Sequence, residues 1–193
     1  MLDAAHVLFA ERGFGAVTMD DVAAEVGVTK PLLYAYFGNK EQLYIACMRR
    51  AGDALLAAIM EAVAGAAPGF GALREGVGAF FGFLDEDRDA WRVLFDETLP
   101  AGGAVAAGVA EYRERLLGLV IGSLLGRVPE RCRAGFSIEV EAFANTLFGA
   151  CEALARWWLR SGAISTAEAA DMLVSTIEPG MRARWAAMSE AMA

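Results

Sequence analysis

The sequence predicts an all-α protein in which a small N-terminal helix-turn-helix unit precedes a larger helical body. Apolar residues recur at helical spacing along almost the whole chain, and no segment shows the strict alternation of a half-buried strand. Residues 18–43 contain two short predicted helices separated by a tight turn, with a further helix behind them. A chain of 193 residues with 56% hydrophobic side chains is large enough for a small domain attached to a larger one.

The first two helices are predicted from apolar spacing and from capping residues. Residues 2–12 form the first helix, with one apolar side facing inward. Thr18 lies three residues before Asp21, which is the spacing of a capping box that satisfies the free N–H groups of a first helical turn. Gly27 ends this second helix, because glycine adopts a left-handed conformation at little cost.

The third helix completes a helix-turn-helix. Thr29 is placed to cap it, Pro31 falls in its first turn where no helical hydrogen bond is lost, and the helix ends at Phe37. In such a motif the second short helix enters the major groove of DNA.

Longer helices are predicted to follow. Ser165 and Glu168 have the spacing of a capping box for the last one, and Pro179 predicts a kink within it. The predicted ranges are 40–63, 70–84, 88–97, 105–125, 130–159 and 166–188.

The N-terminal segment closely resembles the DNA-binding domain of the TetR family of bacterial transcriptional regulators. The matching features are Phe9, Gly13-Phe14, Thr18, Val22-Ala23, the run from Gly27 to Lys30, the run from Leu33 to Phe37, and the run from Asn39 to Glu41. The resemblance implies a helix-turn-helix DNA-binding domain over residues 1–45 and a six-helix ligand-binding and dimerisation domain over residues 46–193. It also implies a basic arm before the first helix. The sequence begins almost at that helix, so either its start is truncated or the arm is lacking.

The resemblance places one set of side chains near DNA: Thr18, Thr29, Lys30, Pro31, Leu32, Tyr34, Tyr36 and Lys40. Of these, we expect Thr18, Tyr36 and Lys40 to contact phosphates. Pro31 and Leu32 have side chains that cannot donate hydrogen bonds. Leu32 is therefore expected to pack on a thymine methyl group, and DNA shape to contribute more to recognition.

The charge balance predicts only modest long-range attraction to DNA. The net charge is −8, and residues 1–50 carry five Lys or Arg against six Asp or Glu. The chain has only two lysines, Lys30 and Lys40, and they flank the predicted recognition helix. Both positions suit phosphate contacts.

The resemblance implies that residues 46–193 bind an effector and pair with a second copy. The candidate effector-binding side chains are Phe80, Trp91, Phe95, Tyr112, Glu141, Asn145 and Phe148. Asn145, in an apolar run, is the candidate polar anchor, and a buried amide bonded to a neighbouring helix is the alternative. Two apolar stripes are predicted to form a four-helix dimer interface: Leu147, Cys151, Leu154 and Trp158, and Leu173, Ile177, Met181 and Trp185.

The function implied by the resemblance is ligand-responsive, DNA-binding regulation of transcription by a homodimer. We expect a repressor that a small, largely apolar effector releases from a palindromic operator by shifting the helix over residues 40–63. A cytoplasmic location is expected, because no signal peptide is recognised and no uncharged run approaches the roughly 18 residues of a membrane span. No metal or cofactor is expected.

The alternatives to this function are an enzyme, a redox-responsive regulator and a helical ligand-binding protein. An enzyme is disfavoured because His6 is the only histidine and no catalytic pair can be built around it. The acidic cluster at residues 85–89 loosely resembles a metal site, but a solvated loop is favoured because the spacing of a calcium loop is missing. A redox-responsive regulator using Cys47, Cys132 or Cys151 stays open, as does a helical ligand-binding protein that does not bind DNA.

Overall fold

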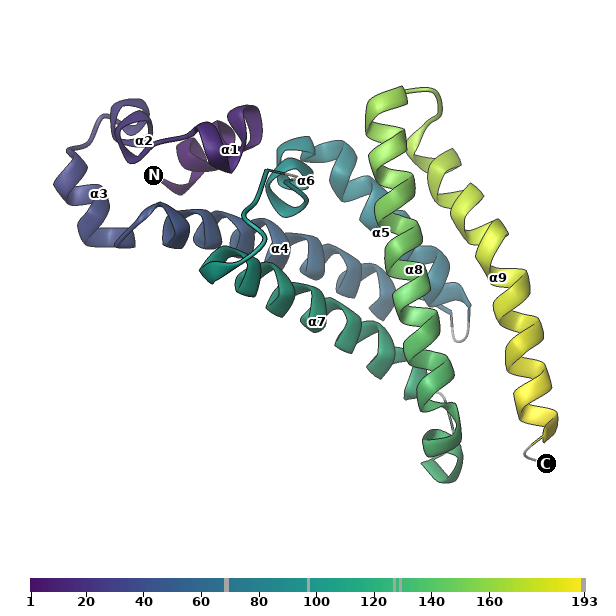
Figure 1. Ribbon diagram of the computed structural model, residues 1–193. Helices are drawn as coiled ribbons and strands as arrows, with labels where there is room; N and C mark the ends of the chain where they lie inside the picture. Colours follow the sequence, from purple (N-terminus) through teal and green to yellow (C-terminus); the bar gives the residue numbers. More distant parts are fainter. Residues whose placement is uncertain (68–69, 97, 127, 129, 192–193) are drawn as a thin grey trace. The chain divides into compact units, whose positions relative to one another are not determined.

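The computed structural model describes the chain apart from residues 68–69, 97, 127, 129 and 192–193 (Figure 1). This described part contains nine α-helices, one short 3-10 helix and no strand, which confirms the predicted all-α class. The helices are α1 (Leu2–Ala16), α2 (Met19–Val26), α3 (Lys30–Phe37), α4 (Lys40–Ala64), α5 (Gly71–Glu86), α6 (Arg88–Leu94), α7 (Gly103–Leu125), η1 (Glu130–Cys132), α8 (Arg133–Ser161) and α9 (Thr166–Ala191). None of the described helices is long and apolar enough to cross a membrane.

Capping residues set the start and end of α2, as predicted. Thr18 Oγ1 accepts a hydrogen bond from the Asp21 N–H at 3.2 Å, and Asp21 Oδ2 accepts one from the Thr18 N–H at 2.8 Å. Gly27 is left-handed, with φ 72, and its N–H bonds back to the last turn of α2. Thr29 occupies the N-cap of α3, but its side chain makes no capping hydrogen bond, so the predicted capping role is wrong.

The end of α1 and the start of α8 differ from the prediction, and the local backbone conformation explains both differences. The chain kinks at Gly13, with φ 74 and ψ 161, and then continues as helix to Ala16, so α1 extends past residue 12. At the other end, α8 begins only at Arg133, because residues 130–132 form the 3-10 turn η1. The capping box at Ser165 and Glu168 is present, with Glu168 Oε2 accepting the Ser165 N–H at 2.8 Å.

The chain divides into two compact units. The first contains Met1–Leu56 and Leu84–Arg113, and the second contains Ala57–Phe83 and Glu114–Ala193. Helices α4, α5 and α7 each contribute residues to both units. The predicted functional division at residues 45 and 46 is a different partition, and it stays a prediction.

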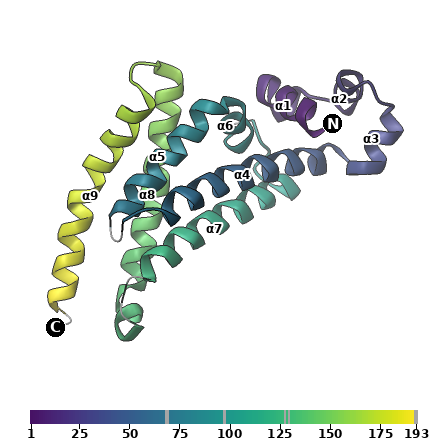
Figure 2. The same ribbon diagram turned by 180° about the vertical axis from the view of Figure 1, so that it is seen from behind.

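An aromatic cluster forms the core of the first unit. Tyr44 is fully buried on α4, with its ring edge-on to Phe9 at 5.0 Å and to Phe14 at 5.1 Å between centroids. Its hydroxyl donates to the Val93 carbonyl of α6 at 2.6 Å. Helix α1 lies beside α6 in both views (Figures 1 and 2). The helix-turn-helix is therefore attached to α4 and α6 through α1.

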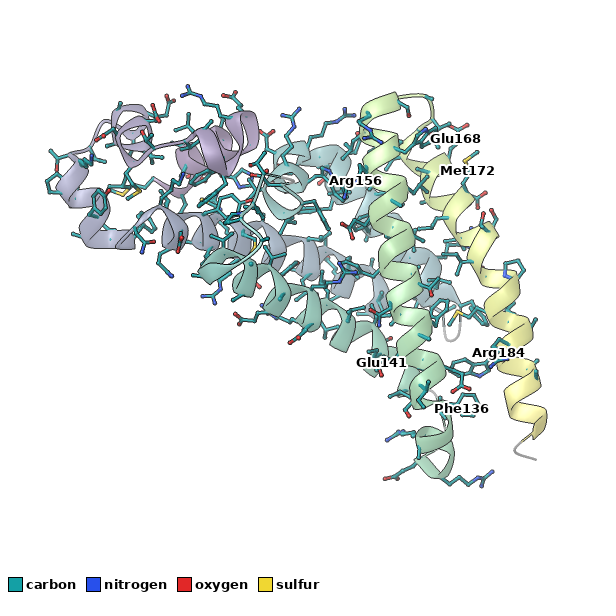
Figure 3. The ribbon with its side chains drawn as sticks, viewed as in Figure 1. Phe136, Glu141, Arg156, Glu168, Met172 and Arg184 are labelled. Carbon is teal, nitrogen blue, oxygen red and sulfur yellow. The ribbon has the colours of Figure 1, made fainter. Side chains whose placement is uncertain are left out.

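Helices α8 and α9 form an antiparallel pair in the second unit (Figures 1 and 2). Phe136 of α8 packs on Trp185 of α9 with ring centroids 5.2 Å apart, and the labelled Phe136 and Arg184 lie at the same end of this pair (Figure 3). Towards the other end of α8, the Trp158 ring lies edge-on to Phe81 of α5, with centroids 5.7 Å apart.

The close approach of α4 to α7 at Gly52 predicts a large cost for an added side chain. The Tyr112 hydroxyl donates to the Gly52 carbonyl, and a Cβ on Gly52 would lie 2.3 Å from the Tyr112 ring. We expect Gly52→Ala to destabilise the fold by about 1–3 kcal/mol through overpacking, despite a helix-propensity gain of about 1 kcal/mol. Urea unfolding measures the change.

Gly78 of α5 provides the matched control. A Cβ there would meet nothing within 4 Å, so Gly78→Ala should leave stability unchanged or raise it. If both variants were equally stable, the close packing at Gly52 would be refuted.

Candidate DNA-binding site

The predicted recognition helix α3 exposes nearly all of its side chains. Leu33 is its only fully buried residue, and Phe37 is half-buried, so these two hold α3 on the rest of the unit. Tyr36 has 69% of its surface exposed, while Leu32 and Tyr34 each have 41%. The predicted base-reading and phosphate-contacting residues of α3 are thus free of the protein core.

Lys30 is engaged by its own unit. Its Nζ lies 2.7 Å from Asp20 Oδ2 on α2, and this hydrogen bond raises the pKa of the exposed lysine. The side chain is charged at neutral pH, but a phosphate must share or displace the Asp20 carboxylate to bind it. The pair also lowers the net positive charge at the start of α3.

Lys40 lies at the start of α4 and contacts the end of α1. Its Nζ donates to the Phe14 carbonyl at 2.9 Å and lies 4.3 Å from the centroid of the Phe14 ring. The predicted phosphate contact stays a prediction, and this lysine also has a structural contact that the sequence did not indicate.

Thr18, the third predicted phosphate contact, uses its hydroxyl locally. Thr18 Oγ1 donates to Asp21 Oδ2 at 2.5 Å while accepting the Asp21 N–H. The bonds that the Thr18 hydroxyl and the Thr18 N–H donate to the Asp21 carboxylate lower the pKa of that carboxyl. The single hydroxyl proton is therefore not free to reach DNA unless the capping box opens.

His6 is buried on α1, and neither of its ring nitrogens has a hydrogen-bond partner among the described residues. Only 7% of its surface is exposed, and its Nε2 lies 3.9 Å from Asp87 Oδ1 at the start of α6. Burial lowers the pKa of His6, and the opposing effect of Asp87 is smaller. The folded state thus favours the neutral imidazole.

We expect acidification to destabilise the folded protein through His6. Its folded pKa lies below the value of about 6.5 in the unfolded chain, so the unfolded state takes up the proton first as pH falls. The free energy of unfolding then decreases between those two pKa values, by at most about 1.4 kcal/mol per pH unit for one proton.

Denaturant titrations from about pH 7.5 to pH 5.5 measure this slope. His6 is the only histidine, so His6→Leu should remove most of the slope in this range. An equal slope in the variant would show that other groups cause it.

The predicted effector-binding residues divide between the two units. Trp91, Phe95 and Tyr112 belong to the first, where the Trp91 and Phe95 rings stack with centroids 4.0 Å apart. Phe80 is buried and Phe148 half-buried in the second. Each unit therefore contributes aromatic side chains to its own interior.

The alternative interpretation of Asn145, a buried amide bonded to a neighbouring helix, is wrong, and its role as the polar anchor stays a prediction. Asn145 is exposed, and its Nδ2 donates to the backbone carbonyl of Glu141 one turn earlier at 2.9 Å. Glu141, labelled in Figure 3, is exposed as well. Val140 and Ala144 are the buried residues of this turn, because they are the apolar positions that face the core.

The predicted dimer stripes are wrong where they form the core of the protomer. Trp158 is only 4% exposed, and its Nε1 donates to the Ile164 carbonyl at 3.0 Å. Leu173 and Met181 are buried too, and Trp185 is packed on Phe136. The partly buried remainder of both stripes stays a prediction: Leu147, Cys151, Leu154 and Ile177.

The redox alternative is disfavoured at two cysteines. Burial raises the pKa of the Cys47 and Cys151 thiols to about 12, so little reactive thiolate exists at neutral pH. The side chain of Cys132 lies outside the described residues.

The acidic cluster before and within α6 has local partners. Asp87 caps α6 by accepting the Ala90 N–H at 2.9 Å. Arg88 donates to Asp85 at 3.3 Å, and Arg92 donates to Asp89 at 3.1 Å. Within the described residues, no group of three or more ligating side chains is arranged to hold a metal ion.

The residues that position the helix-turn-helix were largely missed from sequence. Asp96, after α6, accepts the Phe14 N–H at 2.8 Å across a separation of 82 residues. Gly13 provides the positive-φ kink that turns this N–H out of α1. A Gly-Phe pair within an apolar helix was the available signal, but it does not identify the acceptor.

These features together define a helix-turn-helix protein with an exposed recognition helix and a larger helical body. Residues 1–47 match the family model of bacterial regulatory proteins of the tetR family, and residues 68–179 match the tetracyclin repressor-like C-terminal domain. The chain belongs to the TetR family of bacterial regulatory proteins.

Individual relatives agree with this assignment. The crystal structure of a TetR-like transcriptional regulator from Rhodococcus sp. RHA1 is 33% identical, covers 94% of this chain and 93% of that chain, and has a TM-score of 0.73. The HTH-type transcriptional activator FasR of Mycolicibacterium smegmatis is 36% identical over 109 residues, which are 56% of this chain and 50% of that protein. The HTH-type transcriptional regulator BetI of Rhizobium meliloti is 31% identical over 142 residues, which are 74% of this chain and 63% of that protein. The chain thus spans less than two thirds of the length of these two curated relatives.

Proposed function

We propose that this protein is a ligand-responsive transcriptional regulator that binds an operator as a homodimer through α3. The observation that carries the proposal is the construction of α3. Leu33 is buried as its anchor, while the side chains from Thr29 to Tyr36 on its other sides are exposed behind the tight turn at Gly27. Membership of the TetR family supports the same role.

Recognition of the operator is proposed to depend on apolar contacts and DNA shape. The exposed face of α3 offers Leu32 for thymine methyl groups, and the hydroxyls of Tyr34 and Tyr36 for phosphates or base edges. Lys30 is held by Asp20, so direct readout by a charged side chain is limited. The operator should therefore show preferences at positions that no side chain touches.

The dimer surface is proposed to use the exposed sides of α8 and α9. Ile138 is 76% exposed and Trp157 is 43% exposed on α8, and small residues lie between them at helical spacing: Ala142, Thr146, Gly149 and Ala153. Met172 is 53% exposed on α9, where Figure 3 labels it. Small residues between large apolar ends allow two helices to approach closely across a two-fold axis. Two half-sites one turn of the DNA helix apart require two recognition helices, and therefore a pair of protomers.

The effector is proposed to be small and largely apolar, and the regulator to be a repressor that releases DNA when the effector binds. Among the described residues, His6 is the only side chain classed as polar or charged that is buried, and the other buried side chains are aliphatic, aromatic or sulfur-containing. The Mycolicibacterium relative is named an activator, so a promoter–reporter assay with and without the regulator is needed to decide the direction.

Selection of bound fragments from genomic DNA with the purified protein tests the proposal. The expected result is a palindromic sequence with half-sites about 10 base pairs apart from centre to centre. Tyr36→Ala should weaken binding to that sequence, while Met60→Ala, which alters an exposed side chain of α4 in the second unit, should not. If no fragment is enriched over random DNA, the helical ligand-binding protein becomes the better interpretation.

A further inference from the structure

The peptide groups of Phe14 are held from one side by the loop that follows α6. At Gly13 the backbone leaves the helical conformation, and the Phe14 N–H donates to Asp96 Oδ2 at 2.8 Å. A carboxylate acceptor makes this a charge-assisted hydrogen bond, which is stronger than a bond between neutral groups.

The Asp96 carboxylate is itself fixed in place. Its second oxygen, Oδ1, accepts both the backbone N–H and the hydroxyl of Thr98 at 2.7 Å each. A Cβ on Gly13 would lie 3.0 Å from Thr98 Oγ1, so the Thr98 side chain lies close to the kink in α1. All of these atoms belong to the first unit.

The other side of Phe14 is held by the start of α4. Lys40 donates to the Phe14 carbonyl and covers its ring. Lys40 lies three residues after the end of α3 at Phe37, so its position is tied to that of the recognition helix. Phe14 therefore connects Asp96 to the start of α4 through two successive contacts, and α3 ends three residues before that start.

We propose that Asp96 is a positioning residue for DNA binding, acting on α3 through Phe14 and Lys40. This inference rests on the proposed function. A displacement of the loop after α6 pulls on the Phe14 N–H and, through the Phe14 carbonyl, on the start of α4 beside α3. The operator affinity thus depends on Asp96, a side chain outside the recognition helix. The path from Asp96 reaches α4 only at its first residue, Lys40, and does not run along the length of that helix.

Asp96→Asn tests the proposal. The amide retains one oxygen, so its NH₂ must face either the Phe14 N–H or the donors of Thr98, and at least one bond is lost. Asp89→Asn is the matched control, because it removes the same charge from a half-buried carboxylate of α6 that pairs with Arg92 in the same helix. Neutralising a carboxylate by itself strengthens DNA binding, and the control isolates that effect.

We expect Asp96→Asn to bind the selected operator at least tenfold more weakly than Asp89→Asn, with equal binding of both to random duplex DNA. Loss of folded protein lowers both affinities together, so the ratio of operator to random affinity separates positioning from instability. Equal ratios in the two variants would overturn the proposal. If Asp96→Asn does not fold, Thr98→Val removes only the hydroxyl bond to Asp96, and a reduced ratio is expected there too. An unchanged ratio in that variant would also overturn it.

Two further measurements define the path. In a Lys40→Met background, Asp96→Asn should cause a smaller additional loss of operator affinity than in the natural protein, whereas additive losses would refute a shared path. Amide hydrogen exchange without DNA should be faster at residues 30–37 in Asp96→Asn than in Asp89→Asn. The exchange measurement needs no operator. If the protein enriches no DNA fragment, the proposed function is refuted, but the effect of Asp96 on α3 can still be measured. Equal exchange in the two variants would count against Asp96.

Discussion

Leu33→Ala is expected to destabilise the N-terminal unit by about 2–5 kcal/mol and to abolish operator binding at physiological temperature. Leu33 is fully buried and is the only side chain of α3 that is, so its removal leaves a cavity beneath the recognition helix. Stabilities of whole domains are typically about 5–15 kcal/mol, so this loss is a large fraction of the total.

Leu32→Ala is the matched control for this prediction. Leu32 is the adjacent leucine of the same helix, with 41% of its surface exposed. Its truncation should change the free energy of unfolding by less than about 0.5 kcal/mol. If it packs on a thymine methyl group, operator affinity falls while stability does not. Denaturant unfolding and a DNA-binding titration of both variants distinguish the structural role of Leu33 from a DNA contact made by Leu32. Equal stability losses would contradict the orientation of α3.

Ile138→Arg is expected to convert the proposed dimer to a monomer and to lower operator affinity by about a hundredfold or more. Ile138 is 76% exposed in the protomer, so the substitution does not disturb the core. In a symmetric dimer it places two like charges at an apolar surface that loses its water. Binding of one half-site then lacks the gain from a linked second site.

Met60→Arg provides the control for the dimer surface. Met60 is 53% exposed on α4, a helix that is not part of the proposed surface on α8 and α9. Met60→Arg introduces the same charge, and we expect it to leave the mass unchanged. Sedimentation or light scattering gives the mass of each variant. A dimeric Ile138→Arg protein that binds DNA normally would place the interface elsewhere.

Local chemistry made the helices predictable. The capping boxes at Thr18 and Ser165, and the left-handed glycine at position 27, each depend on residues only a few positions apart, and the structure contains all three. Gly13 was missed as a kink because a glycine at the end of an apolar run also fits a simple helix end, which is where the first helix was predicted to stop.

The second unit was harder because periodicity identifies a shared face but not the neighbour of that face. The stripe containing Trp158 was interpreted as a dimer interface, yet the indole packs against Phe81 in the same protomer. The position of Asn145 in an apolar run suggested burial, although Ala144 beside it occupies the inward position. Contacts such as that between Asp96 and Phe14 join segments distant in sequence, and a single sequence carries no signal for them.

Both lysines already have partners within the first unit, and this affects how the regulator searches a chromosome. Sequence-independent affinity for DNA comes mainly from cations that displace condensed counterions, and each of the two lysines must share or leave a partner to do so. The proposed dimer is consequently expected to dwell only briefly on non-operator sequences and to move between them mostly by diffusion through solution rather than by sliding. A smaller share of the molecules would then be bound to the rest of the genome, and a low copy number would keep the operator occupied.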